Sequence, residues 1–184
     1  MSKPEFVVTL VIGPDCDTES LAMRLALEYF GARVYVHYVG RPNDLVEVLS
    51  GEDRVLDTNY LILNFHGEEG KFCVPELENS IYEVNEPKGR FFDDEHVRKY
   101  AVVEGLNVIG CGCTLGKDSL AKAFLKKGCK AYIAPDDYID GNANLMFVLT
   151  FFYELISNRR SQEDAFQIAR SIDSETNMYN NFTN

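Results

Sequence analysis

The alternation of short apolar runs with segments of helical periodicity is the feature that most constrains this fold. Each run is rich in β-branched or aromatic residues and ends near glycine, proline or polar residues, which is typical of buried strands. Strands that alternate with helices form a mostly parallel sheet covered on both faces. We therefore expect an α/β protein. The predicted strands span residues 6–12, 34–39, 60–65, 106–110 and 130–134.

Helical segments fill the connections between these strands. Leu21, Leu25 and Tyr29 fall on one face of a predicted helix that ends at Gly31. Residues 142–156 are apolar on nearly every face, so we expect a deeply packed helix there. Further helices are predicted over residues 41–51, 93–105, 118–128 and 161–172.

The length of 184 residues is enough for one domain with a proper core, and we expect residues 1–184 to form it. Residues 68–92, where proline, glycine, asparagine and glutamate are scattered, are predicted to be an irregular insertion. Residues 174–184 are a polar tail, and we expect its end to be frayed.

Charge and hydropathy exclude several classes of protein. A formal net charge of −11 argues against a nucleic-acid partner, because nucleic acids reward basic faces. There is no apolar run long enough to span a bilayer, so we expect no membrane partner. The N-terminal "MSKPEF" lacks the apolar region of a signal peptide, which predicts a cytoplasmic protein. Five cysteines, an odd count, do not suggest a disulfide framework.

Two apolar runs end in a reactive side chain among glycines. "LILNFHG" places His66 after the third predicted strand, and "VIGCGCTLG" places Cys113 after the fourth. Consecutive parallel strands usually lie side by side, and sites in such sheets form at the carboxyl ends of the strands. We therefore expect His66 and Cys113 to meet at one edge of the sheet.

This pair of residues suits cysteine proteolysis, which needs a sulfur nucleophile, a proton carrier and an oxyanion hole. Cys113 offers the sulfur, and His66 offers an imidazole that titrates near neutrality. The backbone N–H groups of Gly67 and Cys113 are candidates for the oxyanion hole. Gly112 and Gly116 would allow a tight turn that exposes the sulfur.

Cys111 is the rival nucleophile. Strand alternation points it into the packing of the sheet, whereas Cys113 lies past Gly112, nearer the start of the following helix, whose dipole favours a thiolate. Thr114, three residues after Cys111, is β-branched and poorly suited to positive φ. We therefore favour Cys113.

Other interpretations use the same residues. His66 alone would usually be a structural histidine. "GCTLGKDS" has neither the glycine at position 111 nor the Ser or Thr at position 118 that a phosphate-binding loop requires. A zinc site of Cys111, Cys113 and His66 would lack an evident fourth ligand, and a redox switch between the two cysteines would lack the C-x-x-C pattern. We expect no metal and no cofactor.

The motifs, in order, resemble the caspase-like peptidases of clan CD, and most closely their bacterial CHAT branch. The resemblance covers about residues 6–173. It implies a caspase-like three-layer α/β/α sandwich with a mostly parallel central sheet. The stretches that carry it are "LILNFHG", "LNVIGCGCTLG", "SLAKAFLKKGCKAYIAPDDYID" and "FFYELISNRRSQEDAFQIAR".

The resemblance also implies roles for single residues. The His-Gly of the family falls on His66 and Gly67, and its nucleophile, followed three positions later by glycine, falls on Cys113 with Gly116. Many relatives carry Asp or Ser two residues before the nucleophile, where this chain has Cys111. In the members with Asp, that side chain helps to recognise a basic P1 residue.

The sequence thus predicts a cysteine endopeptidase that acts on a protein or peptide substrate through a Cys113–His66 dyad. The alternative is a catalytically silent caspase-like module that binds a partner protein, and a regulatory partner is compatible with either. A third option is a regulatory α/β domain of the flavodoxin type. We expect the substrate pocket to include Asp136, Asp137 or Asp140 after the fifth strand, together with Cys111, because a carboxylate there would select a basic side chain.

Overall fold

The predicted strands come together in one six-stranded sheet in the computed structural model, which describes residues 6–183. Its spatial order is β2-β1-β3-β7-β8-β9, and every pair is parallel except β8–β9. The α/β architecture with a mostly parallel central sheet is therefore confirmed. The strands are β1 (Val7–Ile12), β2 (Arg33–Tyr38), β3 (Tyr60–Asn64), β7 (Asn107–Cys111), β8 (Ala131–Pro135) and β9 (Tyr179–Thr183).

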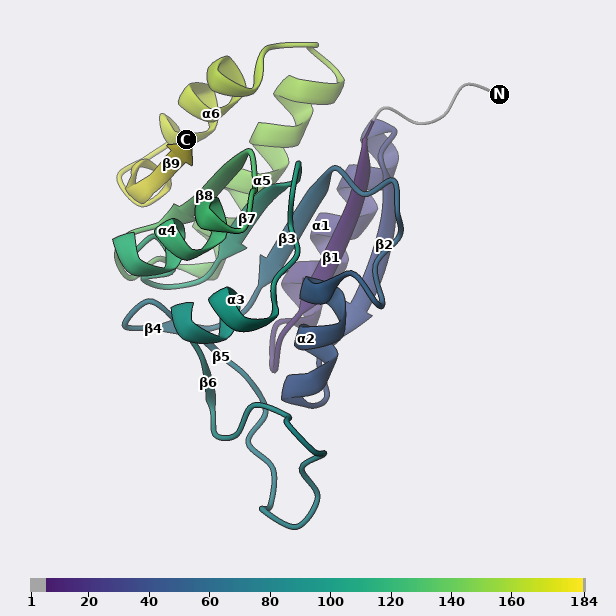
Figure 1. Cartoon of the computed structure of the whole chain (residues 1–184). Helices are drawn as coiled ribbons and strands as arrows, with labels where there is room; N and C mark the ends of the chain where they lie inside the picture. The colour runs from purple at the N-terminus through teal and green to yellow at the C-terminus, as the bar shows by residue number, and fades with distance from the viewer. Residues whose placement is uncertain (1–5, 184) are drawn as a thin grey trace.

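Helices cover both faces of this sheet and make three layers (Figure 1). One layer comprises α1 (Asp17–Phe30), α5 (Gly141–Ile156) and α6 (Gln162–Arg170). The opposite layer comprises α2 (Pro42–Ser50), α3 (Asp94–Tyr100) and α4 (Asp118–Lys126). None of the helices within residues 6–183 has the length and apolar character needed to cross a membrane.

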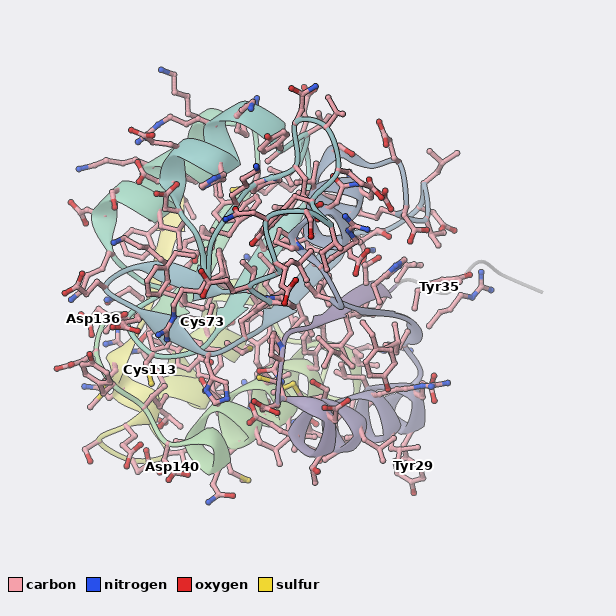
Figure 2. The ribbon with its side chains drawn as sticks, turned by 90° about the horizontal axis from the view of Figure 1, so that it is seen from below. Tyr29, Tyr35, Cys73, Cys113, Asp136 and Asp140 are labelled. Carbon is pink, nitrogen blue, oxygen red and sulfur yellow. The ribbon has the colours of Figure 1, made fainter. Side chains whose placement is uncertain are left out.

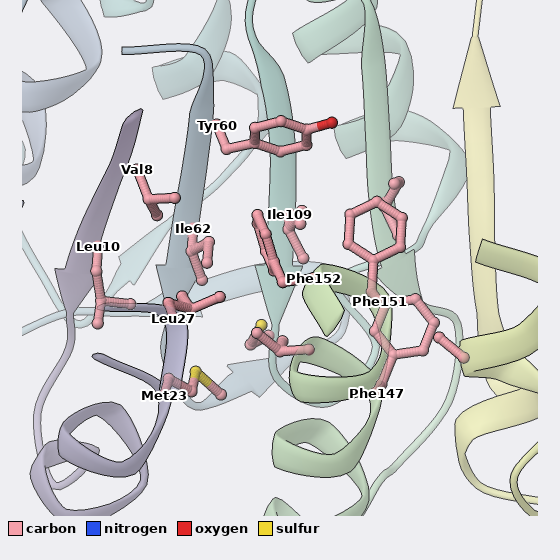
Figure 3. Close-up of a cluster of buried hydrophobic side chains, with 14 of the residues drawn as sticks. Val8, Leu10, Met23, Leu27, Tyr60, Ile62, Ile109, Phe147, Phe151 and Phe152 are labelled. Carbon is pink, nitrogen blue, oxygen red and sulfur yellow. The ribbon is translucent and has the colours of Figure 1, made fainter. Parts of the chain in front are cut away.

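The side chains of each central strand alternate between these two layers, as the pleat requires. On β3, Tyr60 and Ile62 pack toward α1 and α5, while Leu61 and Leu63 pack toward α2, α3 and α4. Figure 3 shows the first of these clusters, where Ile62 and Ile109 lie beside aromatic side chains of α5. This parity also decides which layer the residues that follow each strand will face.

The apolar face that the spacing picks out on α1 is turned away from the core. Leu21, Leu25 and Tyr29 are 53%, 58% and 89% exposed, whereas Met23 and Leu27 are fully buried. Tyr29 lies at the outer rim of the molecule in Figure 2. Both sets are apolar at helical spacing, so only packing against the sheet and α5 decides which one is buried (Figure 3).

The segment predicted to be irregular contains a small antiparallel sheet. It consists of β4 (Gly67–Glu68), β5 (Lys71–Cys73) and β6 (Phe91–Phe92). Between β5 and β6 a long loop projects from the body of the molecule (Figure 1). Glu86 ties this loop to the start of α2 through two hydrogen bonds from the Arg41 guanidinium.

The C-terminal segment is ordered, so the prediction of a frayed end is wrong for the described residues. A 3₁₀ turn (Thr176–Met178) leads into β9, which closes the sheet against β8. Tyr179 is fully buried, its ring stacks on Phe147 with centroids 3.6 Å apart, and its hydroxyl donates to Asn144 Oδ1. This burial holds a strand that is otherwise polar. Residues 1–5 and 184 of the predicted domain lie outside the described residues.

Candidate active site

The strands that carry the two motifs are neighbours, as predicted. β3 pairs in parallel with β7, and the register places Asn64 opposite Cys111. His66 and Cys113 each follow two residues later, so they leave the sheet at the same level. Asn64 contacts Ser20 of α1, and Cys111 packs in the α1–α5 cluster. Because side chains alternate along a strand, His66 and Cys113, two residues further on, are expected to face the same α1–α5 layer.

His66 and Cys113 line one small pocket at this edge of the sheet. Its volume is about 100 Å³, and it lies between the carboxyl ends of β3 and β7 and the starts of α1 and α5. Figure 2 looks onto this end of the sheet and shows Cys113 among the strand ends. The lining residues are Cys16, Glu19, Asn64, Phe65, His66, Gly112, Cys113, Ile139, Gly141 and Asn144.

The two candidate catalytic side chains are not hydrogen bonded to each other. Cys113 is half-buried, and its Sγ donates to the carbonyl oxygen of Ile139 at 3.5 Å. His66 is exposed, and its ring has no hydrogen-bond partner among residues 6–183. The imidazole is therefore free to turn toward the sulfur, and catalytic hydrogen bonds are often open before substrate binds.

Glycines around the pocket allow backbones to approach closely, rather than supplying positive φ. A Cβ at Gly67 would lie 2.1 Å from the Cys113 carbonyl oxygen, and one at Gly112 would lie 2.1 Å from the Phe65 carbonyl oxygen. A Cβ at Gly116 would lie 2.6 Å from the carbonyl oxygen of Ala134. These contacts press the loop after β7 against the ends of β3 and β8.

The turn after the nucleophile candidate uses a residue that we thought unsuited to it. Thr114 has a φ of +59°, the left-handed conformation that a β-branched residue rarely adopts. Its N–H donates to the Asp137 carbonyl, and its Oγ1 accepts from the Gly70 N–H. These bonds to two other segments hold the strained backbone directly after Cys113.

Two backbone N–H groups beside the sulfur remain available. The Cys73 N–H donates to the His66 carbonyl, which makes the next pair, Gly67 with Phe72, the non-hydrogen-bonded pair of the β4–β5 ladder. The Gly67 N–H is therefore not used by that ladder. The Cys113 N–H donates to no acceptor among the described residues.

Cys111 lies inside the sheet packing. It is fully buried, and burial raises the pKa of its thiol. Cys111 does not line the pocket that contains Cys113 and His66. Nor do residues 6–183 contain a group of three His, Cys, Asp or Glu side chains arranged to hold a metal ion.

The three aspartates after β8 occupy different places. Asp136 is exposed and its Oδ2 accepts from Asn180 of β9, while Asp137 accepts from its neighbour Tyr138. Neither lines the pocket. Asp140 caps α5 by accepting from the Asn142 N–H, and it lies between two pocket residues, Ile139 and Gly141.

Glu19 is a pocket residue that the sequence gave no reason to single out. Burial, followed by the negative charge of Asp140, raises its pKa to about 7. Its Oε1 is buried and has no hydrogen-bond partner among residues 6–183. In sequence, Glu19 is one acid among several in the first turn of a helix, which is a common stabilising position. Only the packing of α1, whose Ser20 accepts a hydrogen bond from Asn64 of β3, brings Glu19 to the cysteine.

Two further cysteines flank the site. Cys16 lines the pocket, and burial raises its pKa to about 12. Cys73 lies opposite His66 on β5, and residues opposite each other on antiparallel strands share a face. Burial raises the pKa of Cys73, and nearby Cys113 adds to this rise. No sequence motif pointed to either cysteine.

Comparison with known proteins identifies the fold. Neither a protein-family model nor a curated protein matches the sequence. Among solved structures, separase of Saccharomyces cerevisiae in complex with securin matches with a TM-score of 0.63 and 10% identity. That match covers 98% of this chain and 12% of separase.

The cysteine proteinase gingipain R, described as Arg-specific, also matches, with a TM-score of 0.59 and 12% identity. A chain from the complex of the pro- and mature domains of Porphyromonas gingivalis RgpB gives a TM-score of 0.57 and 11% identity. These matches cover 94% of this chain and 44% and 45% of the gingipain chains. The chain thus spans less than half of the length of each neighbour. At such identities the likeness establishes the fold alone, and the fold of this chain is caspase-like.

Proposed function

We propose that this protein is a cysteine endopeptidase in which Cys113 is the nucleophile and His66 is the general acid and base. The observation that carries the proposal is the shared pocket, which both side chains line from the ends of adjacent parallel strands. Cys111 is a poorer candidate because it is fully buried. The caspase-like fold is compatible with this chemistry, and the motif order favours the CHAT branch of that fold.

In the first half of the reaction, the Cys113 sulfur attacks the scissile carbonyl carbon as His66 accepts the thiol proton. The developing oxyanion would be held by the N–H groups of Gly67 and Cys113, which have no partner in the β4–β5 ladder or in the turn. The carbon–nitrogen bond then breaks, and His66 returns the proton to the leaving amine. The product is a thioester on Cys113.

In the second half, His66 takes a proton from water, and the resulting hydroxide attacks the thioester carbonyl. The carbon–sulfur bond breaks, the acid product leaves, and the proton returns to the Cys113 sulfur. Neither half requires a metal or a cofactor.

The second candidate function is a silent module that binds a partner protein through the same cleft. The observation that favours it is the hydrogen bond from the Cys113 Sγ to Ile139, because the sulfur is engaged away from His66. In such a module the pocket would hold a peptide without attacking it.

Labelling with a peptide acyloxymethyl ketone separates the two functions. An endopeptidase should form one covalent adduct, located at Cys113 by peptide mass spectrometry. Cys111→Ser should label at the wild-type rate, and Cys113→Ser should not label. A protein that forms no adduct with a library of such peptides would be the silent module. An adduct that persists in Cys113→Ser and disappears in Cys111→Ser would mean that the wrong sulfur has been chosen.

A further inference from the structure

The carboxylate of Glu19 is the most unusual charged group in the pocket. Its Oε1 is buried without a partner, and no Lys or Arg of residues 6–183 forms an ion pair with it. A buried carboxylate is normally hydrogen bonded or paired, because an unpaired charge loses its hydration without compensation. Oε1 of Glu19, beside a candidate nucleophile, is an exception among the described residues, and a substrate group could supply its partner.

Other acidic residues near Glu19 make the local charge more negative, which favours binding of a cation. Asp140, at the start of α5, adds a second negative charge. The Asp140 N–H donates to the Glu175 carboxylate, which brings a third acid to the same corner of the fold. The Asn64 side chain counteracts the effect of burial on Glu19 only in part. The described lining of the pocket therefore carries the Glu19 carboxylate, with two more acids nearby, and contains no Lys or Arg.

The geometry lets a ligand reach this carboxylate. Glu19 and Cys113 line the same pocket, so a side chain entering it would lie beside the sulfur. Gly141 leaves room at the carboxylate, because a Cβ there would lie 2.9 Å from Glu19 Oε2. The terminal torsion of a glutamate is broad and roughly twofold, so either oxygen can turn into the pocket.

We propose that Glu19, supported by Asp140, selects a substrate with a Lys or Arg side chain next to the bond that Cys113 cleaves. The proposal rests on the proposed peptidase function of this site. A charge-assisted contact in a small, partly desolvated pocket gives strong discrimination, because a neutral side chain would leave the carboxylate unpaired. Asp136 and Asp137, which lie outside the pocket, would not take part.

The same arrangement makes the selection depend on pH. Burial and Asp140 bring the pKa of Glu19 to about 7, so its charged, cation-binding form grows as pH rises through neutrality. The other titratable groups around Glu19 are Cys16 directly before α1, His66 after β3, Cys111 of β7, Cys113 after β7 and Tyr179 of β9. His66 is the proposed general acid and base, so the test must separate its effect on the chemistry from the effect of Glu19 on selection.

The test compares acyloxymethyl ketone peptides that differ only in the residue next to the reactive group, which is arginine, norleucine or glutamate. We use the ratio of the labelling rate with the arginine probe to that with the norleucine probe. The contribution of His66 cancels in this ratio, because both probes react by the same chemistry. At pH 8 we expect a wild-type ratio of at least about thirty. In Glu19→Gln the ratio should fall at least about tenfold, because the arginine probe loses its charged partner. Glu28→Gln, an exposed acid on the same helix, is the matched control and should keep the ratio.

The wild-type ratio should increase between about pH 6 and pH 8, and this increase should be absent in Glu19→Gln. The proposal is overturned if the wild-type protein labels equally fast with norleucine or glutamate, or if Glu19→Gln keeps the arginine preference.

If no probe reacts, that result contradicts the proposed peptidase function but leaves the cation site at Glu19 to be tested. A binding measurement then tests the cation site directly. Agmatine, a small guanidinium compound, is titrated by NMR into Cys113→Ala and into Cys113→Ala/Glu19→Gln. In Cys113→Ala we expect the amide chemical shifts of Gly112 and Asn144 to change and reach saturation. In Cys113→Ala/Glu19→Gln we expect no saturation. Equal titration curves, or no saturation in either protein, would refute a cation site at Glu19.

Discussion

Two glutamates of this chain, each with a buried carboxylate oxygen, are in opposite electrostatic situations. Glu86, in the loop between β5 and β6, accepts hydrogen bonds from the Arg41 guanidinium and from the N–H groups of Asn43 and Glu83. Arg41 is the main cause that lowers the pKa of Glu86 to about 2. Glu19, in the pocket, has an oxygen without a hydrogen-bond partner in the described part of the chain, and burial is the main cause that raises its pKa to about 7.

The comparison shows that the charge of Glu86 stabilises the folded state, whereas the charge of Glu19 destabilises it. The hydrogen bonds of Glu86 attach a projecting loop to the start of α2, so its charge is favourable only in the folded state. The charge of Glu19 is unfavourable in the folded state, and such perturbed groups gather at functional sites. The pocket and the Arg41–Glu86 clamp should therefore respond oppositely to substitution.

The largest effect is expected within the pocket, for His66→Ala. Loss of the proton carrier should reduce labelling of Cys113 at least about a hundredfold. Because the His66 ring is exposed and has no hydrogen-bond partner in the described chain, the urea midpoint should stay unchanged. Labelling at the wild-type rate would remove His66 from the mechanism.

The next effect is expected in the clamp, for Glu86→Gln. The side chain is fully buried, and the change leaves the Arg41 guanidinium and two N–H donors without a charged acceptor. The free energy of unfolding at pH 7 should fall by about 2 to 3 kcal/mol, measured with urea. Labelling of Cys113 should persist under folding conditions. A variant as stable as the wild type would show that the clamp is only a surface contact.

Glu19→Gln should change the free energy of unfolding in the opposite direction, that is, it should increase it. The folded-state pKa of Glu19 is about 7, above its ordinary value of 4.5, so its ionisation destabilises the fold as pH rises from about 4.5 through 7. The neutral variant should be more stable than the wild type by about 1 to 2 kcal/mol at pH 8, and equal to it near pH 4. An equal difference at both pH values would point to packing instead of charge.

The stabilising effect of Glu86 should depend on pH only in acid, whereas the destabilising effect of Glu19 should change near neutral pH. Its folded-state pKa is depressed, so its contribution is fully present above about pH 4.5 and is lost as pH falls toward about 2. The difference in stability between wild type and Glu86→Gln should therefore be flat from pH 5 to 8 and shrink in acid. Urea titrations at a series of pH values measure it.

The smallest effect is expected for an exposed carboxylate. Glu28 pairs with Arg24 one helical turn away, and both side chains are more than a third exposed. Glu28→Gln should change stability by less than about 0.5 kcal/mol at any of these pH values. A larger change would mean that the contrast between Glu19 and Glu86 does not reflect burial.

The sequence by itself determined the five parallel strands, the helices between them, and the position of His66 and Cys113 after the ends of adjacent strands. These follow from local patterns: apolar runs of strand length, glycine at helix ends, and the rule that consecutive parallel strands lie side by side. The pairing of β3 with β7 needed no knowledge of side-chain packing.

Tertiary structure alone decided the features that depend on which surfaces pack together. β9 was missed because its residues are mostly polar, and Tyr179 is held by its stacking on Phe147, a contact distant in sequence. Thr114 adopts positive φ because bonds to two other segments outweigh its own preference. Glu19 reaches the pocket because α1 buries Met23 and Leu27 and leaves Leu21 outside. A hydrophobic pattern shows that a helix has an apolar stripe, but packing against the sheet fixes its rotation, and that rotation sets the charge beside Cys113.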